Sequence, residues 1–331
     1  MVTEPDKAFV MGGTWRIPVL TGLQSKNFIQ DLKNDGSFND AAFSREYESE
    51  WSGSSEDAFF RAEAFDRNRE LQKPEYEYSK RSGSQSYYII GVDVGRKDCD
   101  SVAIVFKVNP QTMGDSIASI VNIYTFSDEH FKYQAIKLKQ LFYKYKAKRL
   151  IIDGNGLGIG LIDEMVMSQE DPITGDIYPD FGIYNDNDGS YHKYKTKKTE
   201  QEAVYIIKAN APINSDAHSN VQARLNAGKI KFLIDEKEAK NKLLGTKVGQ
   251  NMTPEERAEY LRPFTLTSIL KEEMLNLREE NEGLNINLKQ ANKKIRKDKF
   301  SALEYGLYYI KHEEENRKRK RFNVKDWMFM N

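Results

Sequence analysis

Two apolar segments of this chain end in the same way, with an aspartate followed closely by glycine. The first is the run 87–92, which leads into Asp93-Val94-Gly95, and the second is the run 149–152, which leads into Asp153-Gly154. A carboxylate at the end of a buried strand is costly unless it is paired or binds a cation. The two segments therefore predict buried strands of one sheet, with the aspartates side by side where neighbouring strands end.

The rest of the chain alternates between strand-like and helical patterns. Apolar and β-branched runs predict strands, and apolar residues spaced three to four apart predict helices. We expect strands at 87–92, 101–108, 119–126, 149–153, 204–207 and 230–234, helices at 129–145, 156–167, 216–226, 266–280 and 297–312, and a hairpin arm at 284–288. The first three strands have the spacing of an antiparallel meander, and the strand after the first helix should be parallel. This order predicts an α/β fold with a mixed central sheet and helices on both faces.

Composition excludes several classes of protein. The 331 residues are 39% hydrophobic and 30% charged, with 17 Phe, 18 Tyr and 3 Trp to build a core. These values exclude a wholly disordered chain, a collagen-like chain and a disulfide scaffold. Cys99 is the single cysteine, so we expect no internal disulfide, no cysteine-based zinc site and a reducing, cytosolic setting. No apolar run approaches the ~20 residues that a membrane-spanning helix needs, so we expect no membrane partner.

Charge is balanced overall, with 50 basic and 50 acidic residues, but it is unevenly distributed. Acids concentrate in 45–77, and bases concentrate in 132–149, 192–198, 289–299 and 317–321. Such runs are either solvated faces or contacts for phosphate, and the second and third also carry Tyr or Asn. Our candidate DNA-contacting residues are Lys193, Lys195, Lys197, Lys198, Lys293, Lys294, Arg296, Lys297 and Lys299.

A third acid would complete a metal site with Asp93 and Asp153. Asp298 is the best candidate, because it begins a helix whose apolar positions and small residues, Ala302 and Gly306, allow close packing on the sheet. Carboxylates without His or Cys nearby favour Mg²⁺ or Mn²⁺ over zinc. Simpler alternatives exist for each residue. Asp298 could be an ordinary acid of a helix N-terminus, Asp153-Gly154 an ordinary turn, and Asp93 part of the phosphate loop of an actin-like ATPase.

Five segments carry a resemblance to a known family: GVDVGRKDCDSVAIV at 91–105, RLIIDGNGLGIGLID at 149–163, GKIKFL at 228–233, TSILKEEMLNL at 267–277 and KDKFSALEYGLYY at 297–309. In order and spacing, over roughly residues 85–312, they resemble the C-terminal nuclease region of a tailed-phage terminase large subunit, the DNA-packaging motor protein. The resemblance implies a ribonuclease H-like fold and a two-metal endonuclease that cuts concatemeric viral double-stranded DNA during genome packaging.

The resemblance also implies specific residues and partners. By position, Asp93, Asp153 and Asp298 would be the catalytic, metal-binding acids, holding two Mg²⁺ or Mn²⁺ ions. Many members carry another acid three residues after the third position, where this chain has Ser301, and Glu304 is a weaker substitute. Asp98, Asp100 and Asp163 are possible accessory acids, or caps of turns and helices. Expected partners are double-stranded DNA, a portal protein, the small terminase subunit and the ATPase portion of the motor, in the cytoplasm of a host cell.

The same comparison suggests how the chain is divided. Residues 1–78 resemble the end of the family's ATPase region, or they form an extension packed on the nuclease domain. A small, polar linker would follow at 79–86, the nuclease domain at 87–315 and a basic C-terminal tail at 316–331. The sequence contains no G-x-x-x-x-G-K-[ST] loop, so we expect no ATPase activity from this chain alone.

Three other functions stay open at this stage. A Holliday-junction resolvase of the same fold would be a dimer that prefers four-way junctions. An actin-like or sugar-kinase-like nucleotide-binding protein would share the sheet and the Asp93 loop, but would need a second phosphate loop and a glycine-rich adenosine pocket late in the chain. A non-catalytic assembly module would use the same acids structurally and would not respond to metal.

Overall fold

The structure is a computed structural model, and it describes residues 13–34, 47, 58–79, 84–95, 100–112, 114–126, 130–195, 201–282 and 285–328. Predictions for Asp98, for Lys197 and Lys198, and for half of the linker at 79–86 lie outside these residues. Within them, no helix is both long enough and apolar enough to cross a bilayer.

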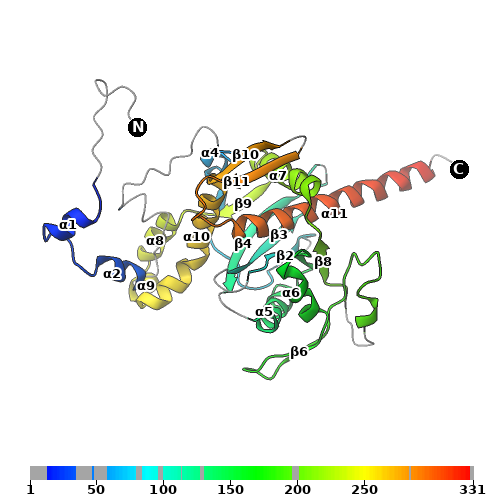
Figure 1. Cartoon of the computed structure of the whole chain (residues 1–331), viewed down its shortest axis with the longest axis horizontal. Helices are drawn as coiled ribbons and strands as arrows, with labels where there is room; N and C mark the ends of the chain where they lie inside the picture. Colours follow the sequence, from blue (N-terminus) through cyan, green and yellow to red (C-terminus); the bar gives the residue numbers. More distant parts are fainter. Residues whose placement is uncertain are drawn as a thin grey trace.

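The core of the fold is a seven-stranded mixed sheet (Figure 1). Its order is β1 (Arg69–Leu71), β9 (Ile230–Leu233), β4 (Ile117–Phe126), β3 (Ser101–Asn109), β2 (Tyr87–Asp93), β5 (Arg149–Asp153) and β8 (Val204–Ile207). β2, β3 and β4 are antiparallel neighbours, whereas β5 and β8 follow β2 in parallel. A three-stranded meander extended by parallel strands on the side of its first strand is the ribonuclease H-like arrangement, so the predicted fold class is confirmed.

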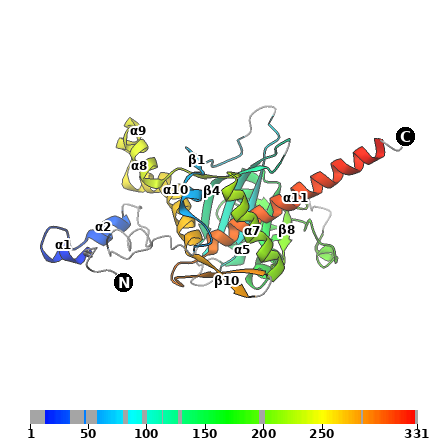
Figure 2. The same cartoon turned by 90° about the horizontal axis from the view of Figure 1, so that it is seen from above.

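Helices cover both faces of this sheet. On one face, α5 (Phe131–Lys144) and α6 (Leu157–Met165) pack on the even-numbered residues of β2. On the other, α7 (Ala211–Asn226), α10 (Pro254–Leu275) and α11 (Asp298–Met328) share a core with its odd-numbered residues. Figures 1 and 2 show α11 crossing the sheet and continuing well beyond it. Residues 316–328, predicted as a separate tail, therefore continue this helix.

The remaining elements are short. They comprise the helices α1 (Arg16–Leu20), α2 (Phe28–Asn34), α4 (Ala62–Asp66), α8 (Glu236–Leu244) and α9 (Lys247–Asn251), a 3-10 turn η1 (His192–Tyr194), and two hairpins, β6 (Gln169–Glu170) with β7 (Ile177–Tyr178) and β10 (Leu277–Glu282) with β11 (Asn285–Gln290).

The helix predicted at 266–280 has different ends in the structure. α10 begins at Pro254, where Thr253 and Glu256 form a capping box, and proline is well placed in the first turn. It ends at Leu275, and the residues from Leu277 onward pair with β11 instead. The prediction was wrong here because the apolar helical spacing continues to Leu277. Leu277 is indeed buried, but as the first residue of strand β10 and not as part of the helix.

Residues 58–78, placed by the sequence in an N-terminal extension, pack into the core of the sheet. Phe60 and Phe65 are buried in the same cluster as Ile89, and Phe65 stacks on Phe232 with ring centroids 4.0 Å apart. β1 pairs in parallel with β9 and so adds a strand to the sheet edge. These residues therefore share one core with the predicted nuclease domain.

α11 lies unusually close to the middle of the sheet. A Cβ placed on Gly91 of β2 would lie 2.3 Å from the backbone oxygen of Ala302, and one on Gly306 would lie 2.3 Å from the Phe106 ring. Both glycines are needed because the neighbouring atoms leave no room for a side chain. The close contact fixes where α11 begins, and Asp298 is its first residue.

We predict that Gly91→Ala lowers the free energy of unfolding by about 1–3 kcal/mol, because the backbone of α11 must move to admit the methyl group. Urea unfolding checks this. Gly245→Ala is the matched control, since its Cβ would lie 3.4 Å from the nearest carbonyl oxygens. Equal unfolding midpoints for the two variants would contradict the tight packing.

The basic stretch 132–149 contains one lysine that is not solvated. Lys139 is fully buried, and its ammonium donates hydrogen bonds to the carbonyl oxygens of Met167 and Pro179. It also lies 5.0 Å from the centre of the Phe181 ring. Burial lowers the pKa of Lys139 to about 8, although the charge of Asp180 opposes the shift. Lys139 thus holds the segment after α6 against α5.

Because the pKa of Lys139 is lower in the folded chain than in the unfolded chain, its charged form costs stability at neutral pH. We predict that unfolding free energy rises as pH increases from about 8 to about 10.5, by on the order of 3 kcal/mol, relative to Lys139→Met. The measurement is the parent-minus-variant difference in urea unfolding across this range. A difference that does not change with pH would refute the assignment.

Candidate active site

Asp93 and Asp153 lie next to each other at one edge of the sheet. Asp93 is the last residue of β2 and Asp153 the last residue of β5, and the two strands are parallel neighbours with Val92 paired to Ile152. The following residues therefore emerge at the same level of the sheet. Asp93 belongs to the odd-numbered residues of β2, which face α11.

Asp298 lies near the same edge of the sheet, on the face that α11 covers. It is the first residue of α11, and 24% of its side chain is exposed. Burial raises the pKa of Asp93 to about 8, and the negative charges of Asp298 and Asp153 raise it further. Burial also raises the pKa values of Asp153 and Asp298. The structure thus brings the three predicted acids close enough for their charges to act on Asp93.

The surroundings of Asp93 suit a hard divalent cation. No described residue donates a hydrogen bond to its carboxylate, and its charged neighbours are mostly acids, with Lys297 as the opposing base. Repulsion among buried carboxylates is relieved when they share a cation. As the side chains stand, however, no group of three His, Cys, Asp or Glu in the described part of the chain is arranged to hold a metal ion.

The orientation of the Asp298 side chain is one reason why the three acids are not arranged around a metal site. One oxygen of its carboxylate faces Arg296, with Nη1 at 3.9 Å, and the same guanidinium nitrogen lies 4.0 Å from Asp100. Arg296 therefore bridges Asp298 to Asp100, one of the possible accessory acids.

Asp153 is held in position by its neighbours. Tyr305 of α11 donates a hydrogen bond from its hydroxyl to Asp153 Oδ2 at 3.3 Å, and the backbone N–H of Asn155 donates to Oδ1 at 3.1 Å. The side chain of Asn155 in turn donates to the carbonyl of Ala209 at 2.8 Å, which ties the turn to the end of β8. α11 therefore contributes both Asp298 and the tyrosine that orients Asp153.

Glu273 of α10 is a positioning residue that the sequence analysis missed. Only 1% exposed, it accepts a hydrogen bond from the backbone N–H of Phe300 at 3.0 Å and one from the Lys299 ammonium at 3.1 Å. A carboxylate that accepts N–H groups at a helix start is favoured by the helix dipole. A signal was present in the sequence, because Glu273 lies three residues after Leu270 and next to Met274 on the apolar face of its helix.

The other candidate acids have different surroundings. Glu304 is buried and lies 2.7 Å from Nδ1 of His218 on α7, so its carboxylate is engaged there. Ser301, where the sequence resemblance led us to look for another acid, is also buried. Asp163 is exposed on α6.

The predicted basic residues fall into separate groups. Lys293, Lys294, Arg296 and Lys297 are exposed in the segment between β11 and α11. Lys293 and Lys297 line an open hollow of about 600 Å³ together with Lys289 and Glu280 of the hairpin. Lys299, in contrast, is buried and paired with Glu273.

Lys193 and Lys195 belong to a different segment, which runs beside β8. Lys193 lies 4.9 Å from the centre of the Tyr194 ring, and Lys195 forms an ion pair with Glu202 at 2.7 Å. Asn185 of this segment exchanges hydrogen bonds with the backbone of Ile206, near the end of β8 that adjoins Asp153.

No protein-family model and no curated protein matches the sequence. Among solved structures, the large terminase nuclease from the thermophilic phage G20c with bound magnesium aligns with a TM-score of 0.43 and 13% identity, covering 76% of this chain and 97% of that chain. The same nuclease with bound cobalt gives a TM-score of 0.41 and 14% identity, covering 76% and 97%. The large terminase nuclease domain of Thermus phage P74-26 gives 0.36 and 13%, covering 74% and 93%.

We predict that Glu273→Ala lowers the free energy of unfolding by about 3–5 kcal/mol, because the Lys299 ammonium is then left buried without its partner. Glu273→Gln keeps an acceptor for the Phe300 N–H, so its loss should be smaller. Chemical denaturation measures both. The control is Glu255→Gln, an exposed acid in the first turn of the same helix. If Glu273→Ala were as stable as this control, the positioning role would be excluded.

Proposed function

We propose that this chain is a metal-dependent endodeoxyribonuclease that cuts concatemeric viral double-stranded DNA during genome packaging, as the nuclease part of a terminase large subunit. The proposal is supported by the position of Asp93 and Asp153 at the ends of neighbouring parallel strands of a ribonuclease H-like sheet, with Asp298 near enough for its charge to raise the pKa of Asp93. The order and spacing of the five sequence segments support the same conclusion.

In this proposal, Asp93, Asp153 and Asp298 hold two Mg²⁺ or Mn²⁺ ions. When bound, such ions lower the pKa of the attacking water and stabilise the leaving oxygen of the phosphodiester. The chain itself supplies the orientation. Tyr305 fixes the carboxylate of Asp153, and Glu273 fixes the first turn of α11, from which Asp298 projects.

The DNA backbone would lie against the exposed bases between the hairpin and α11. Lys297 lies close enough to Asp93 for its charge to lower the pKa of that carboxyl, so a phosphate it contacts is near the acids. Lys293 and Lys294 extend this surface along the hollow beside β11, and Arg296 can leave Asp298 for a phosphate. Contacts of this kind are independent of sequence and weaken steeply as salt rises. We leave Lys299 out of this surface, because its ammonium is buried against Glu273.

We further propose that the chain works with the other parts of a packaging motor in the host cell cytoplasm. A portal protein, the small terminase subunit and the ATPase portion would position it on DNA. An ATPase assay of this chain alone should give no hydrolysis above background.

We predict that Asp93→Asn and Asp153→Asn each reduce Mn²⁺-dependent plasmid cleavage by a factor of roughly 100 or more, because a carboxylate that holds the metal is lost. Without metal, the same Asp93→Asn chain should be at least as stable as the parent, since it removes a buried carboxyl whose ionised form the fold disfavours. Adding Mn²⁺ should raise the melting temperature of the parent but not that of the variant.

Asp115→Asn provides the matched control, because Asp115 is about half exposed and its one ion pair among the described residues is with Lys318 on the far part of α11. It should cut and melt like the parent in both conditions. Parent-like cleavage by Asp93→Asn, or an equal Mn²⁺ response in both chains, would overturn the site assignment.

A further inference from the structure

A buried hydrogen-bond network lies immediately beyond Asp93, on the face of the sheet that α5 covers. It connects the backbone of Gly95, two residues after Asp93, with the side chains of Ser101 on β3 and Gln134 on α5. Ser101 and Gln134 are each 1% exposed, and Gly95 is also buried. The proposed active site and DNA surface use neither of these side chains.

The three hydrogen bonds of this Gly95 network close on themselves. The Gly95 N–H donates to Ser101 Oγ at 2.8 Å, the Ser101 hydroxyl donates to Gln134 Oε1 at 2.7 Å, and Gln134 Nε2 donates to the Gly95 carbonyl oxygen at 3.2 Å. Ser101 Oγ also lies 3.0 Å from that carbonyl oxygen. The reverse orientation of the Gln134 amide would place its oxygen against the Gly95 oxygen, where no proton is available. Both backbone groups of Gly95 are therefore tied to Ser101 and Gln134.

The Gly95 network and the carboxylate of Asp93 lie on opposite faces of the sheet. The odd-numbered residues of β2, which include Asp93, face α11, whereas Ser101 is in phase with Ala103 of β3, which packs under α5. Val102, the next residue after Ser101, is paired with Asp93. The network therefore anchors the backbone beside Asp93 without occupying the space around its carboxylate.

This anchor acts against an electrostatic force. Burial raises the pKa of Asp93 to about 8, and the charges of Asp298 and Asp153 contribute to the shift. To bind a cation, Asp93 must ionise beside two other acids, and like charges repel. A backbone that could move would relieve the repulsion by carrying Asp93 away from them. A backbone held at Gly95 keeps the three acids together.

The other end of the network is connected to Asp298. Ser101 directly follows Asp100, whose carboxylate lies 4.0 Å from Arg296 Nη1. The same nitrogen lies 3.9 Å from the carboxylate of Asp298. Fixing Ser101 therefore also fixes the backbone next to the acid that shares Arg296 with Asp298.

We propose that Ser101 and Gln134 are positioning residues of the metal site, which hold the backbone beside Asp93 so that its carboxylate stays with the other two acids when it takes up a cation. This role presupposes the proposed function. Groups that position metal ligands from outside the ligand set commonly contribute roughly 10- to 100-fold to metal affinity. A network with a purely structural role would contribute to stability and leave metal affinity unchanged.

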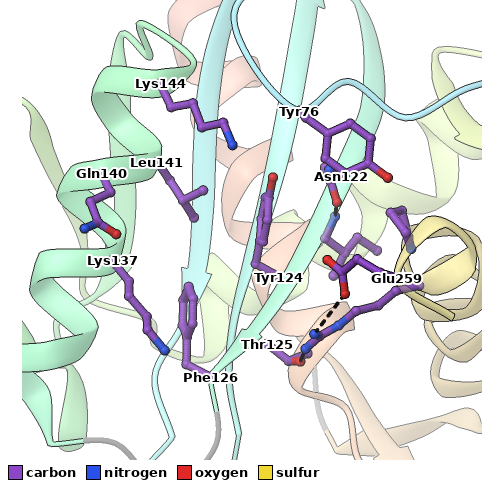
Figure 3. Close-up of a pocket in the computed structure, with 13 residues that line it drawn as sticks. Tyr76, Asn122, Tyr124, Thr125, Phe126, Lys137, Gln140, Leu141, Lys144 and Glu259 are labelled. Carbon is purple, nitrogen blue, oxygen red and sulfur yellow. Dashed lines mark hydrogen bonds and ion pairs between the residues drawn. The ribbon is translucent and has the colours of Figure 1, made fainter. Parts of the chain in front are cut away.

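The same helix offers a matched control. Gln140 of α5 lines a pocket of about 400 Å³ between α5, α10 and the last part of β4 (Figure 3). Its side-chain amide donates a hydrogen bond to Asp171 Oδ2 at 2.7 Å, in the turn between β6 and β7. Gln140→Leu therefore removes the same kind of group from the same helix without touching the Gly95 network.

The test measures metal binding instead of cleavage. The chain is titrated with Mn²⁺, and the unbound ion is followed by its electron paramagnetic resonance signal, which gives the dissociation constant. Ser101→Ala and Gln134→Leu should each raise this constant roughly tenfold or more, at a temperature where circular dichroism shows that both variants are folded. Gln140→Leu should bind Mn²⁺ like the parent.

A second measurement tests the network itself in the metal-free chain. Hydrogen exchange at the Gly95 amide should be slow in the parent and in Gln140→Leu. It should be at least roughly tenfold faster in Ser101→Ala, because the hydroxyl that accepts this N–H is lost.

The outcomes separate the positioning role from the proposed function. If the parent binds Mn²⁺ and both network variants bind it as tightly as Gln140→Leu, the positioning role is overturned and the metal site stands. Unchanged exchange at Gly95 in Ser101→Ala would also overturn the role, because the network would then not hold the backbone. If the parent binds Mn²⁺ no better than Asp93→Asn, the proposed function fails, and the network is structural.

Discussion

The contact between α11 and β2 is the constraint on which the site depends. Gly91 allows the backbone of α11 to approach the strand, and Gly306 does the same at Phe106. This fixes the height and direction of a helix that supplies two functional groups, the carboxylate of Asp298 and the hydroxyl of Tyr305 that holds Asp153. Because the interior is closely packed, an added methyl group here would move both groups together.

The same region stores unfavourable electrostatic energy. Asp93 is buried beside two other acids, and burial also raises the pKa of Glu273 to about 7. Glu273 is compensated by Lys299 and by the helix start, whereas Asp93 has no such partner among the described residues. A fold that tolerates one uncompensated carboxylate and neutralises its neighbour is typical of a functional site rather than a structural one.

The sequence predicted the central strands well because their signals are local. β2, β3, β4 and β5 are unbroken apolar runs bounded by polar residues, and their spacing specifies a meander followed by a parallel strand. The start of α10 and the short strand β1 were missed because their burial depends on distant partners. Leu277 fits a helix and a strand equally well by its spacing, and only its pairing with Gln290 decides between them.

By itself, the sequence determined the fold class and the two aspartates at strand ends, because strand patterns and turn residues are read within a few positions. Tertiary structure decided which charged side chains are solvated and which are buried. It buried Lys139 and Lys299, which the sequence places in basic runs, and it turned Asp298 toward Arg296. It also assembled the pocket from β4, α5 and α10. The reason is physical: a charge has the same sequence signal whether it is solvated or buried, and only packing sets its surroundings.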